Sequence, residues 1–432
     1  MNFNSLNDCK KQTFLFLQGH PSTFARKLAA SLEARGARVL RVNFCFGDWL
    51  YWLGRPAINY RGRFADWPAY LKELIVEHNV TDIIYYGDRR PYHKAAAEVA
   101  QDLGIYAYVY EFGYLRPDWL TLERCGMTAY SHFPSDPERI RSIGTQFPEP
   151  DLVRRYSHSI VLELTHEIFY HLSTYICHAI YFNYFSDRYY NPLLEYLTGI
   201  PQQFRRKSAD KEAGKKINEL VENQTRFFLM PLQLQNDYQL RCNATYAHQS
   251  DAIHEIIQSF ATHADQSAEL VFKCHPLDNG AEGWPQHIRT IAQRTGVSNR
   301  VHYIFGGDLD KLLSHAAGTV LINSTVGLHA LIAGCPTKVL GTAIYDIEGL
   351  AHQGTLDGFW TTPAKPNAEL TAQYIRALAG TIQVKGNFFQ KNGQDAAIQV
   401  FVTRLTSGTV NGAGAYVNPP PRQHSITNPD AQ

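Results

Sequence analysis

Residues 110–123 place charged side chains directly after a run of apolar residues. The run 105–110 is typical of a buried strand, and Glu111 and Arg116 follow it. Ligands of open parallel α/β sheets bind beyond the carboxyl ends of the strands. We therefore expect Glu111 to be the principal catalytic carboxylate, acting as a base toward a hydroxyl group or, less readily, as a nucleophile. An ion pair with Arg116 that only orders a surface loop is the alternative.

Polar side chains also follow three other predicted strands in the same half of the chain. These strands span 13–17, 39–44 and 82–86, and each runs into a loop with polar residues. Parallel strands end at the same edge of a sheet, so the loops indicate one shared cleft. Asp88, beside two arginines, is the competing catalytic carboxylate. The candidates for binding a substrate or an acceptor are Gln18, Gly19, Asp48, Arg90, Tyr114, Arg116 and Glu123.

A second set of strands begins near residue 226. The predicted strand 319–322 leads into Asn323, Ser324 and Thr325, which precede a helix. Hydroxyl groups and free N–H groups at a helix start can bind a phosphate, although a plain helix cap is the alternative. The predicted strand 270–274 ends in a histidine followed by a proline.

Composition excludes several classes of protein. With 41 Lys+Arg against 40 Asp+Glu, the net charge of +1 provides no field for nucleic acid. Seven cysteines without a C-x-x-C pair argue against a disulfide framework and a zinc site, so we expect no metal or cofactor and a reducing cytoplasm. The first residues lack the apolar core of a signal peptide, and no window is apolar enough to span a membrane.

Strands alternate with amphipathic helices, which is typical of βαβ units in an α/β fold. We predict an N-terminal Rossmann-like domain at 13–150, a helical, aromatic and basic insert at 151–224, and a C-terminal Rossmann-like domain at 225–404. Core packing is favoured over membrane contact for the insert's aromatic residues, and His166, His171 and His178 are interpreted as packing residues. The Gly- and Pro-rich residues 405–432 are expected to be disordered. Two such domains facing an interdomain cleft form the GT-B arrangement.

The motifs also resemble a known family. They are F-L-Q-G-H at Phe16, R-V-N-F-C-F-G-D at Arg41, Y-R-G-R at Tyr60, G-D-R-R-P-Y-H at Gly87, E-F-G-Y-L-R-P-D-W-L-T-L-E at Glu111, P-L-Q at Pro231, F-K-C-H-P-L-D at Phe272 and N-S-T-V-G at Asn323. Their order and spacing are similar to the KpsS/LipB family of bacterial capsule polysaccharide proteins. The resemblance implies a retaining β-Kdo glycosyltransferase that uses CMP-Kdo and a phosphatidylglycerol-type lipid acceptor at the cytoplasmic face of the inner membrane.

The same resemblance implies roles for individual residues. Lys273, His275 and Pro276, together with Ser324, Thr325 and Gly327, are expected around the CMP group, with His275 stabilising the leaving phosphate. Glu111, Arg116, Asp88 and Asp48 would face Kdo and the acceptor. Phe112 departs from the family loop, where this position is usually acidic or variable.

The insert's aromatic and basic residues would hold the protein peripherally on the membrane, where other capsule synthesis and export proteins are possible partners. A non-catalytic export or modification subunit and a UDP-sugar 2-epimerase-like enzyme are the alternative functions.

Overall fold

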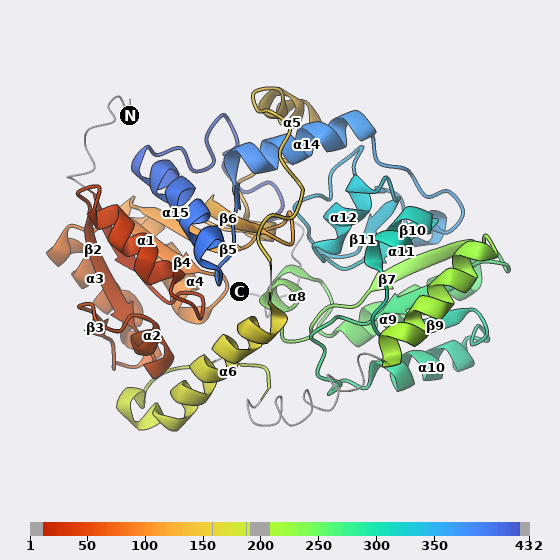
Figure 1. The fold of residues 1–432 in the computed structure, drawn as a ribbon, viewed down its shortest axis with the longest axis horizontal. Helices are drawn as coiled ribbons and strands as arrows, with labels where there is room; N and C mark the ends of the chain where they lie inside the picture. The colour runs from red at the N-terminus through yellow and green to blue at the C-terminus, as the bar shows by residue number, and fades with distance from the viewer. Residues whose placement is uncertain (1–11, 158, 187, 191–207, 424–432) are drawn as a thin grey trace. The chain divides into compact units, whose positions relative to one another are not determined.

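The computed structural model describes residues 12–157, 159–186, 188–190 and 208–423 (Figure 1). The chain forms two compact units. Unit 1 consists of Met1–Pro134, Thr145–Asp187 and Arg376–Pro421, and unit 2 of Ser135–Gly144, Arg188–Ile375 and Arg422–Gln432. Each unit contains one sheet flanked by helices, so the prediction of an α/β fold with two Rossmann-like halves is confirmed.

Unit 1 is built on a seven-stranded sheet in the order β12-β6-β5-β4-β1-β2-β3. Five strands run parallel: β1 Thr13–Phe16, β2 Arg38–Asn43, β3 Ile58–Asn59, β4 Asp82–Tyr86 and β5 Tyr106–Phe112. The strand β6 Trp119–Arg124 is antiparallel to β5, and β12 Gln383–Lys385 is antiparallel to β6. The carboxyl ends of β1, β2, β4 and β5 therefore share one edge of this sheet.

The helices of unit 1 follow the apolar pattern of the sequence. In α1, Phe24, Leu28 and Leu32 recur every four residues and are buried in the core. The helices and 3₁₀ turns are α1 Phe24–Glu33, α2 Phe46–Tyr51, η2 Phe64–Asp66, α3 Trp67–His78, α4 Pro91–Leu103, η3 Thr128–Tyr130, α6 Ile160–Ile176, η4 His178–Tyr181 and α15 Lys391–Thr406.

Unit 2 is built on five parallel strands in the order β11-β10-β7-β8-β9. They are β7 Phe227–Pro231, β8 Glu269–Lys273, β9 Val301–Ile304, β10 Gly318–Leu321 and β11 Thr337–Val339. Its helices are α5 Pro137–Gly144, a helix at 208–222, α8 Tyr238–Asn243, α9 Gln249–His263, α10 Trp284–Arg294, α11 Leu309–His315, α12 Val326–Ile332 and α13 Leu356–Phe359, while α14 Ala368–Thr381 continues into the segment assigned to unit 1.

The C-terminal part of the chain returns to unit 1, which differs from the predicted domain 225–404. Helix α15 lies beside α1 (Figure 1), and its Phe401 and Leu405 share a buried cluster with Leu28 and Leu32. The helical period of a sequence reveals an apolar face but not the element that covers it, so this partner could not be predicted.

The residues after α15 also differ from prediction, because 405–423 are packed against unit 1 or placed by hydrogen bonds. The backbone N–H of Arg124 donates to Oδ1 of Asn411 at 2.8 Å, and the ring of Tyr416 stacks on His132 with centroids 4.3 Å apart. Gly and Asn in this segment serve ordered turns. The rest of the predicted tail, 424–432, lies outside the described residues.

The predicted insert 151–224 is divided between the units. Helix α6 and η4 belong to unit 1, whereas the helix at 208–222 belongs to unit 2. There, Nζ of Lys216 lies 3.2 Å from Glu269 and 3.3 Å from Glu219. The basic residues Arg205, Arg206 and Lys207 lie outside the described residues.

Candidate functional site

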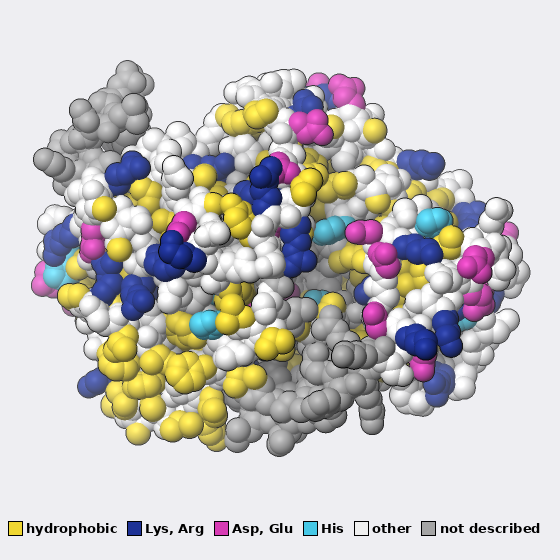
Figure 2. Space-filling model, viewed as in Figure 1, with side chains coloured by type: hydrophobic (Ala, Val, Ile, Leu, Met, Phe, Trp, Pro, Cys, Tyr) yellow, Lys and Arg dark blue, Asp and Glu magenta, His cyan; other side chains and the backbone are white. Residues whose placement is uncertain are grey.

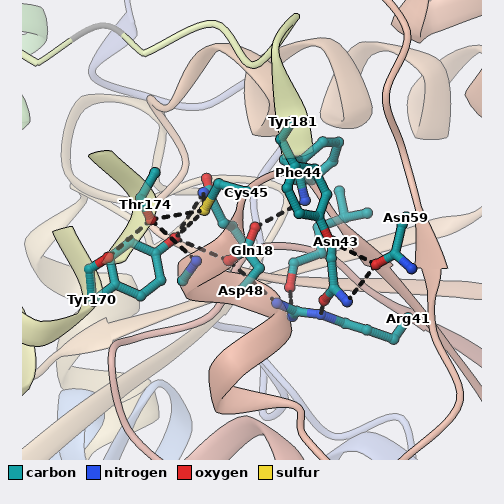
Figure 3. A network of polar contacts seen from close by, with 12 residues as sticks. Gln18, Arg41, Asn43, Phe44, Cys45, Asp48, Asn59, Tyr170, Thr174 and Tyr181 are labelled. Atoms are coloured by element: carbon teal, nitrogen blue, oxygen red, sulfur yellow. Dashed lines mark hydrogen bonds and ion pairs between the residues drawn. The ribbon is translucent and has the colours of Figure 1, made fainter. Parts of the chain in front are cut away.

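A buried polar network lies at the carboxyl edge of the unit 1 sheet (Figure 3). Gln18 follows β1 and donates to the hydroxyl of Tyr170 at 2.9 Å. Tyr170 in turn donates to Oδ1 of Asp48 at 2.9 Å, and the backbone N–H of Phe44 donates to Oδ2 of Asp48 at 3.0 Å. Helix α6 thus contributes a side chain to the edge formed by β1 and β2.

Arg41 supplies the positive charge of this network. Its Nη2 lies 3.4 Å from Oδ1 of Asp48, its Nε donates to Asn43 at 2.9 Å, and its guanidinium stands 5.1 Å from the centre of the Trp52 ring. Arg41 and Asp48 are both buried. Their charges are therefore paired and hydrogen-bonded, as burial of ions requires. Asp48, which was predicted to bind the acceptor, holds the start of α2 in place through the Phe44 N–H.

Cys45 lies within the same network but is not a candidate nucleophile. Burial and the nearby charge of Asp48 raise the pKa of its thiol to about 12. A thiol is nucleophilic as the thiolate, which this environment disfavours at neutral pH.

Glu111 is the penultimate residue of β5 and lies opposite Thr121 of β6, whereas the sequence predicted it directly after the strand. Gly87, at the end of β4, has φ +70, and a Cβ there would stand 4.0 Å from Oε2 of Glu111. The guanidinium of Arg90 lies 5.3 Å from the centre of the Tyr86 ring. Burial raises the pKa of Tyr86, and the negative charges of Glu111 and Glu167 raise it further. Glu163 raises it as well, so three carboxylates act on the same tyrosine.

Glu167 is a residue that sequence reasoning missed. It lies on α6, and its Oε2 is 3.1 Å from Nε2 of His171, one helical turn later. Burial raises the pKa of Glu167, but the hydrogen bond with His171 and the surrounding positive charges outweigh burial and lower it to about 2. The spacing E-x-x-x-H was the only available signal. His171, interpreted as a packing residue, is thus an ion-pair partner.

Three other predicted site residues are held inside unit 1. Oδ2 of Asp88 accepts from the backbone N–H of Met127 at 2.9 Å and lies 3.4 Å from Nε of Arg89. The hydroxyl of Tyr114 donates to Glu123 at 2.9 Å, and both side chains are buried. Their polar atoms stabilise the turn around β6, which argues against direct substrate contact.

The last residue of β5 is the aromatic Phe112 and not a second carboxylate beside Glu111. Phe112 lies edge-on to His20, with centroids 5.2 Å apart, and the exposed Arg116 places its guanidinium 5.1 Å from the Phe112 ring. Phe112 therefore packs between a buried ring and a surface cation. The backbone of Gly19 lies close by, since a Cβ at this position would stand 3.1 Å from the Tyr110 hydroxyl.

In unit 2, the residues predicted to bind the sugar-nucleotide donor lie at the ends of β8 and β10, the strands on either side of β7. Lys273 ends β8 and is buried, whereas Pro276 is exposed. Nδ1 of His275 accepts from the backbone N–H of Leu277 at 3.1 Å, which orients the imidazole. The parallel register places these residues and Ser324 at the same edge of the sheet.

An amide network connects β7 and β10 at this edge. Gln233, after β7, donates to Oδ1 of Asn323 at 2.8 Å, and its Oε1 accepts from the backbone N–H of Asn323 at 3.2 Å. The backbone N–H of Gln233 donates to Gln249 of α9 at 2.8 Å. Gln233 belongs to the P-L-Q motif, and this network positions the loop that carries Ser324 and Thr325.

Ser324 and Thr325 begin α12 without a strong side-chain cap. The Ser324 hydroxyl accepts from the backbone N–H of Val326 at 3.3 Å, and Thr325 makes no side-chain cap hydrogen bond. Tyr345 donates to the carbonyl of Ser324. Both hydroxyl groups are half-buried beside the helix start, where a phosphate could be bound.

Gly327 has a packing role, because a Cβ would overlap the ring of Tyr345. We expect Gly327→Ala to lower the free energy of unfolding by about 1–3 kcal/mol, since overpacking outweighs the roughly 1 kcal/mol gained in helix propensity. Urea unfolding of unit 2 checks this. Gly214→Ala in the helix at 208–222 is the control, because a Cβ there meets no atom within 4 Å. Equal stability of Gly327→Ala and the parent would contradict the packing role.

His166 of α6 was interpreted as a packing residue. Nδ1 of His166 lies 2.7 Å from the Tyr51 hydroxyl, consistent with a packing role. Among the residues that the structure describes, no group of three or more His, Cys, Asp and Glu side chains could hold a metal ion.

Comparison with known proteins identifies the family. The family model "Capsule polysaccharide biosynthesis protein" matches residues 81–389. The capsule polysaccharide export protein KpsS of Escherichia coli is 32% identical over 378 residues, covering 87% of this chain and 96% of the relative. The capsule polysaccharide modification protein LipB of Neisseria meningitidis serogroup B is 30% identical over 391 residues, covering 88% and 92%.

A solved structure, the β-Kdo 2,7 transferase KpsC of Thermosulfurimonas dismutans, covers 90% of this chain and 98% of its own, with 14% identity and a TM-score of 0.41. That likeness is too weak to carry an argument, so the assignment rests on sequence. The family model spans well over half of the chain, and KpsS and LipB match most of its length. The chain belongs to the capsule polysaccharide biosynthesis protein family, as the motif resemblance indicated.

Proposed function

We propose that this protein is a retaining β-Kdo glycosyltransferase that moves Kdo from CMP-Kdo to a phosphatidylglycerol-type lipid at the cytoplasmic face of the inner membrane. The observation that carries the proposal is the arrangement in unit 2. Lys273 ends β8 and His275 follows it, Ser324 and Thr325 follow β10, and Gln233 follows β7, the strand between β8 and β10. Cationic and hydroxyl groups at one sheet edge suit a nucleotide phosphate.

Unit 2 would act on the leaving group. The positive charge of Lys273, with a proton on His275, offsets the negative charge that develops on the CMP phosphate as the bond to Kdo breaks. The hydroxyl groups of Ser324 and Thr325 donate to the phosphate oxygens. Gln233 and Asn323 keep their loops in register by the two hydrogen bonds between them.

Unit 1 would act on the sugar and the acceptor. Glu111 removes the proton from the acceptor hydroxyl as this oxygen attacks the anomeric carbon of Kdo from the face that CMP leaves, because a direct attack from the opposite face would invert the configuration. The carboxylate of Kdo requires a cation, and the exposed Arg116 suits this role because guanidinium groups bind carboxylates in a bidentate manner. Arg90 is less suited, since it already lies among the charges of Glu111 and Glu167.

Binding of CMP by isothermal titration calorimetry tests the proposal against its alternatives. The full chain is expected to bind CMP and to bind UDP more weakly, and Lys273→Ala is expected to weaken CMP binding at least about tenfold because a charge-assisted contact is lost. No binding of either nucleotide would favour a non-catalytic export subunit, which the name of the relative KpsS suggests. Preference for UDP would favour the epimerase-like alternative.

A further inference from the structure

Helix α6 has a second face, opposite to the residues that enter the site. Tyr170 and Glu167 point into unit 1, whereas Phe169 and Ile176 on the same helix are 55% and 69% exposed. Figure 2 shows a gathering of hydrophobic side chains over α2, α6 and η4. Isolated exposed apolar residues are common, but a contiguous patch usually marks an interaction site.

The members of this patch come from segments packed against each other. The backbone N–H of Gly47 in α2 donates to Thr174 in α6 at 3.1 Å, and η4 follows α6 after one residue. We call these exposed side chains the α2–α6–η4 surface: Trp49, Leu53, Phe169, Tyr175, Ile176, Ile180 and Phe182.

This surface has an uncharged centre and a positively charged margin. Residues 168–186 contain no Asp, Glu, Lys or Arg. Two guanidinium groups lie at its margin: Arg26 donates to the carbonyl of Leu53 at 2.9 Å, and that of Arg61 stands 5.8 Å from the Tyr181 ring centre. An uncharged centre with Trp, Tyr and Phe side chains and a cationic margin matches the chemistry of an anionic bilayer interface. A second copy of the chain would place these like charges near each other.

We propose that the α2–α6–η4 surface docks on a lipid bilayer and inserts its aromatic and aliphatic side chains among the headgroups. Among the described residues, no helix is long and apolar enough to cross a membrane, so the contact would lie in the plane of the interface. This inference rests on the proposed function, since a lipid acceptor would be the reason for docking. The helix that touches the bilayer also carries Glu167 and Tyr170, so docking brings the site to the lipid surface.

The docking force differs from the one that the sequence suggested. Lys216, a basic residue of the predicted insert, is paired with Glu219 and Glu269 in unit 2. The surface itself is apolar, and burial of apolar area is not screened by salt, whereas attraction between exposed charges is. Binding should therefore persist at high ionic strength.

Co-sedimentation with vesicles of phosphatidylcholine and phosphatidylglycerol tests the surface. The full chain is expected to bind at about 0.1 M salt and to keep most of its binding at about 1 M. The double variant Phe169→Ser/Ile176→Ser is expected to lose at least about tenfold in partitioning. The control is Val76→Ser on α3, whose side chain is 68% exposed and lies outside the surface.

Two readouts separate the outcomes. Unchanged CMP binding and an unchanged circular dichroism spectrum in the double variant would show that only docking is lost. A parent that binds vesicles but not CMP would count against the proposed function and not against the docking surface. Vesicle binding of the double variant equal to the parent would overturn the inference. So would light scattering that finds a dimeric parent and a monomeric variant, since a second copy would then cover the surface.

Discussion

Replacement of Glu111 by Gln is expected to lower the rate of Kdo transfer by about 10²–10⁴-fold, the contribution of a positioned general base. The amide keeps the shape of the side chain at the end of β5 but cannot take a proton. Gly87 lies beside this carboxylate, since a Cβ at position 87 would stand 4.0 Å from Oε2 of Glu111. Transfer from CMP-Kdo, followed by chromatography of the lipid product, measures the loss.

Asp88→Asn is the matched comparison for Glu111→Gln. Because Asp88 is bonded to the backbone of Met127 and paired with Arg89, this variant is expected to lose stability and not specifically catalysis. If Glu111→Gln keeps its rate while a folded, CMP-binding Asp88→Asn loses it, Asp88 is the catalytic carboxylate. Glu167→Gln shows whether the second carboxylate contributes, since loss in Glu167→Gln with a normal Glu111→Gln would move the role to α6.

Replacement of His275 by Ala is expected to lower the rate by about 10²–10³-fold, as for other preorganised groups that stabilise developing charge. The hydrogen bond from the Leu277 N–H to Nδ1 leaves Nε2 as the nitrogen that carries the proton. The loss should appear mainly in kcat, because negative charge grows on the phosphate as the bond breaks.

His315→Ala is the control for His275→Ala, since His315 is an exposed histidine of α11 in the same unit. A normal rate with CMP-Kdo in His275→Ala would exclude leaving-group stabilisation. Equal losses in both variants would indicate damage to unit 2 and not to the site.

The two sheets could be predicted because their signals are local. Apolar runs followed by residues such as Phe24, Leu28 and Leu32 show a strand and then an amphipathic helix. The return of α15 to α1 depends on contacts between residues as far apart in the chain as Phe24 and Phe401, which no local pattern contains. The prediction of disorder at 405–423 was wrong because it rested on composition alone. The turns there are held by individual hydrogen bonds, such as that from the Arg124 N–H to Asn411, which composition does not reveal.

The candidate site was predictable only in part, for a similar reason. The edge position of Glu111, Lys273 and His275 follows from strand direction alone. Glu123 was misplaced because β5 and β6 form an antiparallel pair, which returns the chain and sets Glu123 opposite Val109 in the interior. Tyr170 and Glu167 were missed since the sequence shows that α6 is aromatic but not which sheet edge it meets.

The most direct test of the central claim is a reconstituted transfer reaction. The purified full chain is incubated with CMP-Kdo and phosphatidylglycerol in vesicles, and the lipid is analysed by mass spectrometry. We expect a lipid with added Kdo, together with release of free CMP in equal amount for the first sugar, and at least about a hundredfold less of both products from Glu111→Gln. Absence of a Kdo-lipid from a folded parent that binds CMP and these vesicles would contradict the assigned donor and acceptor.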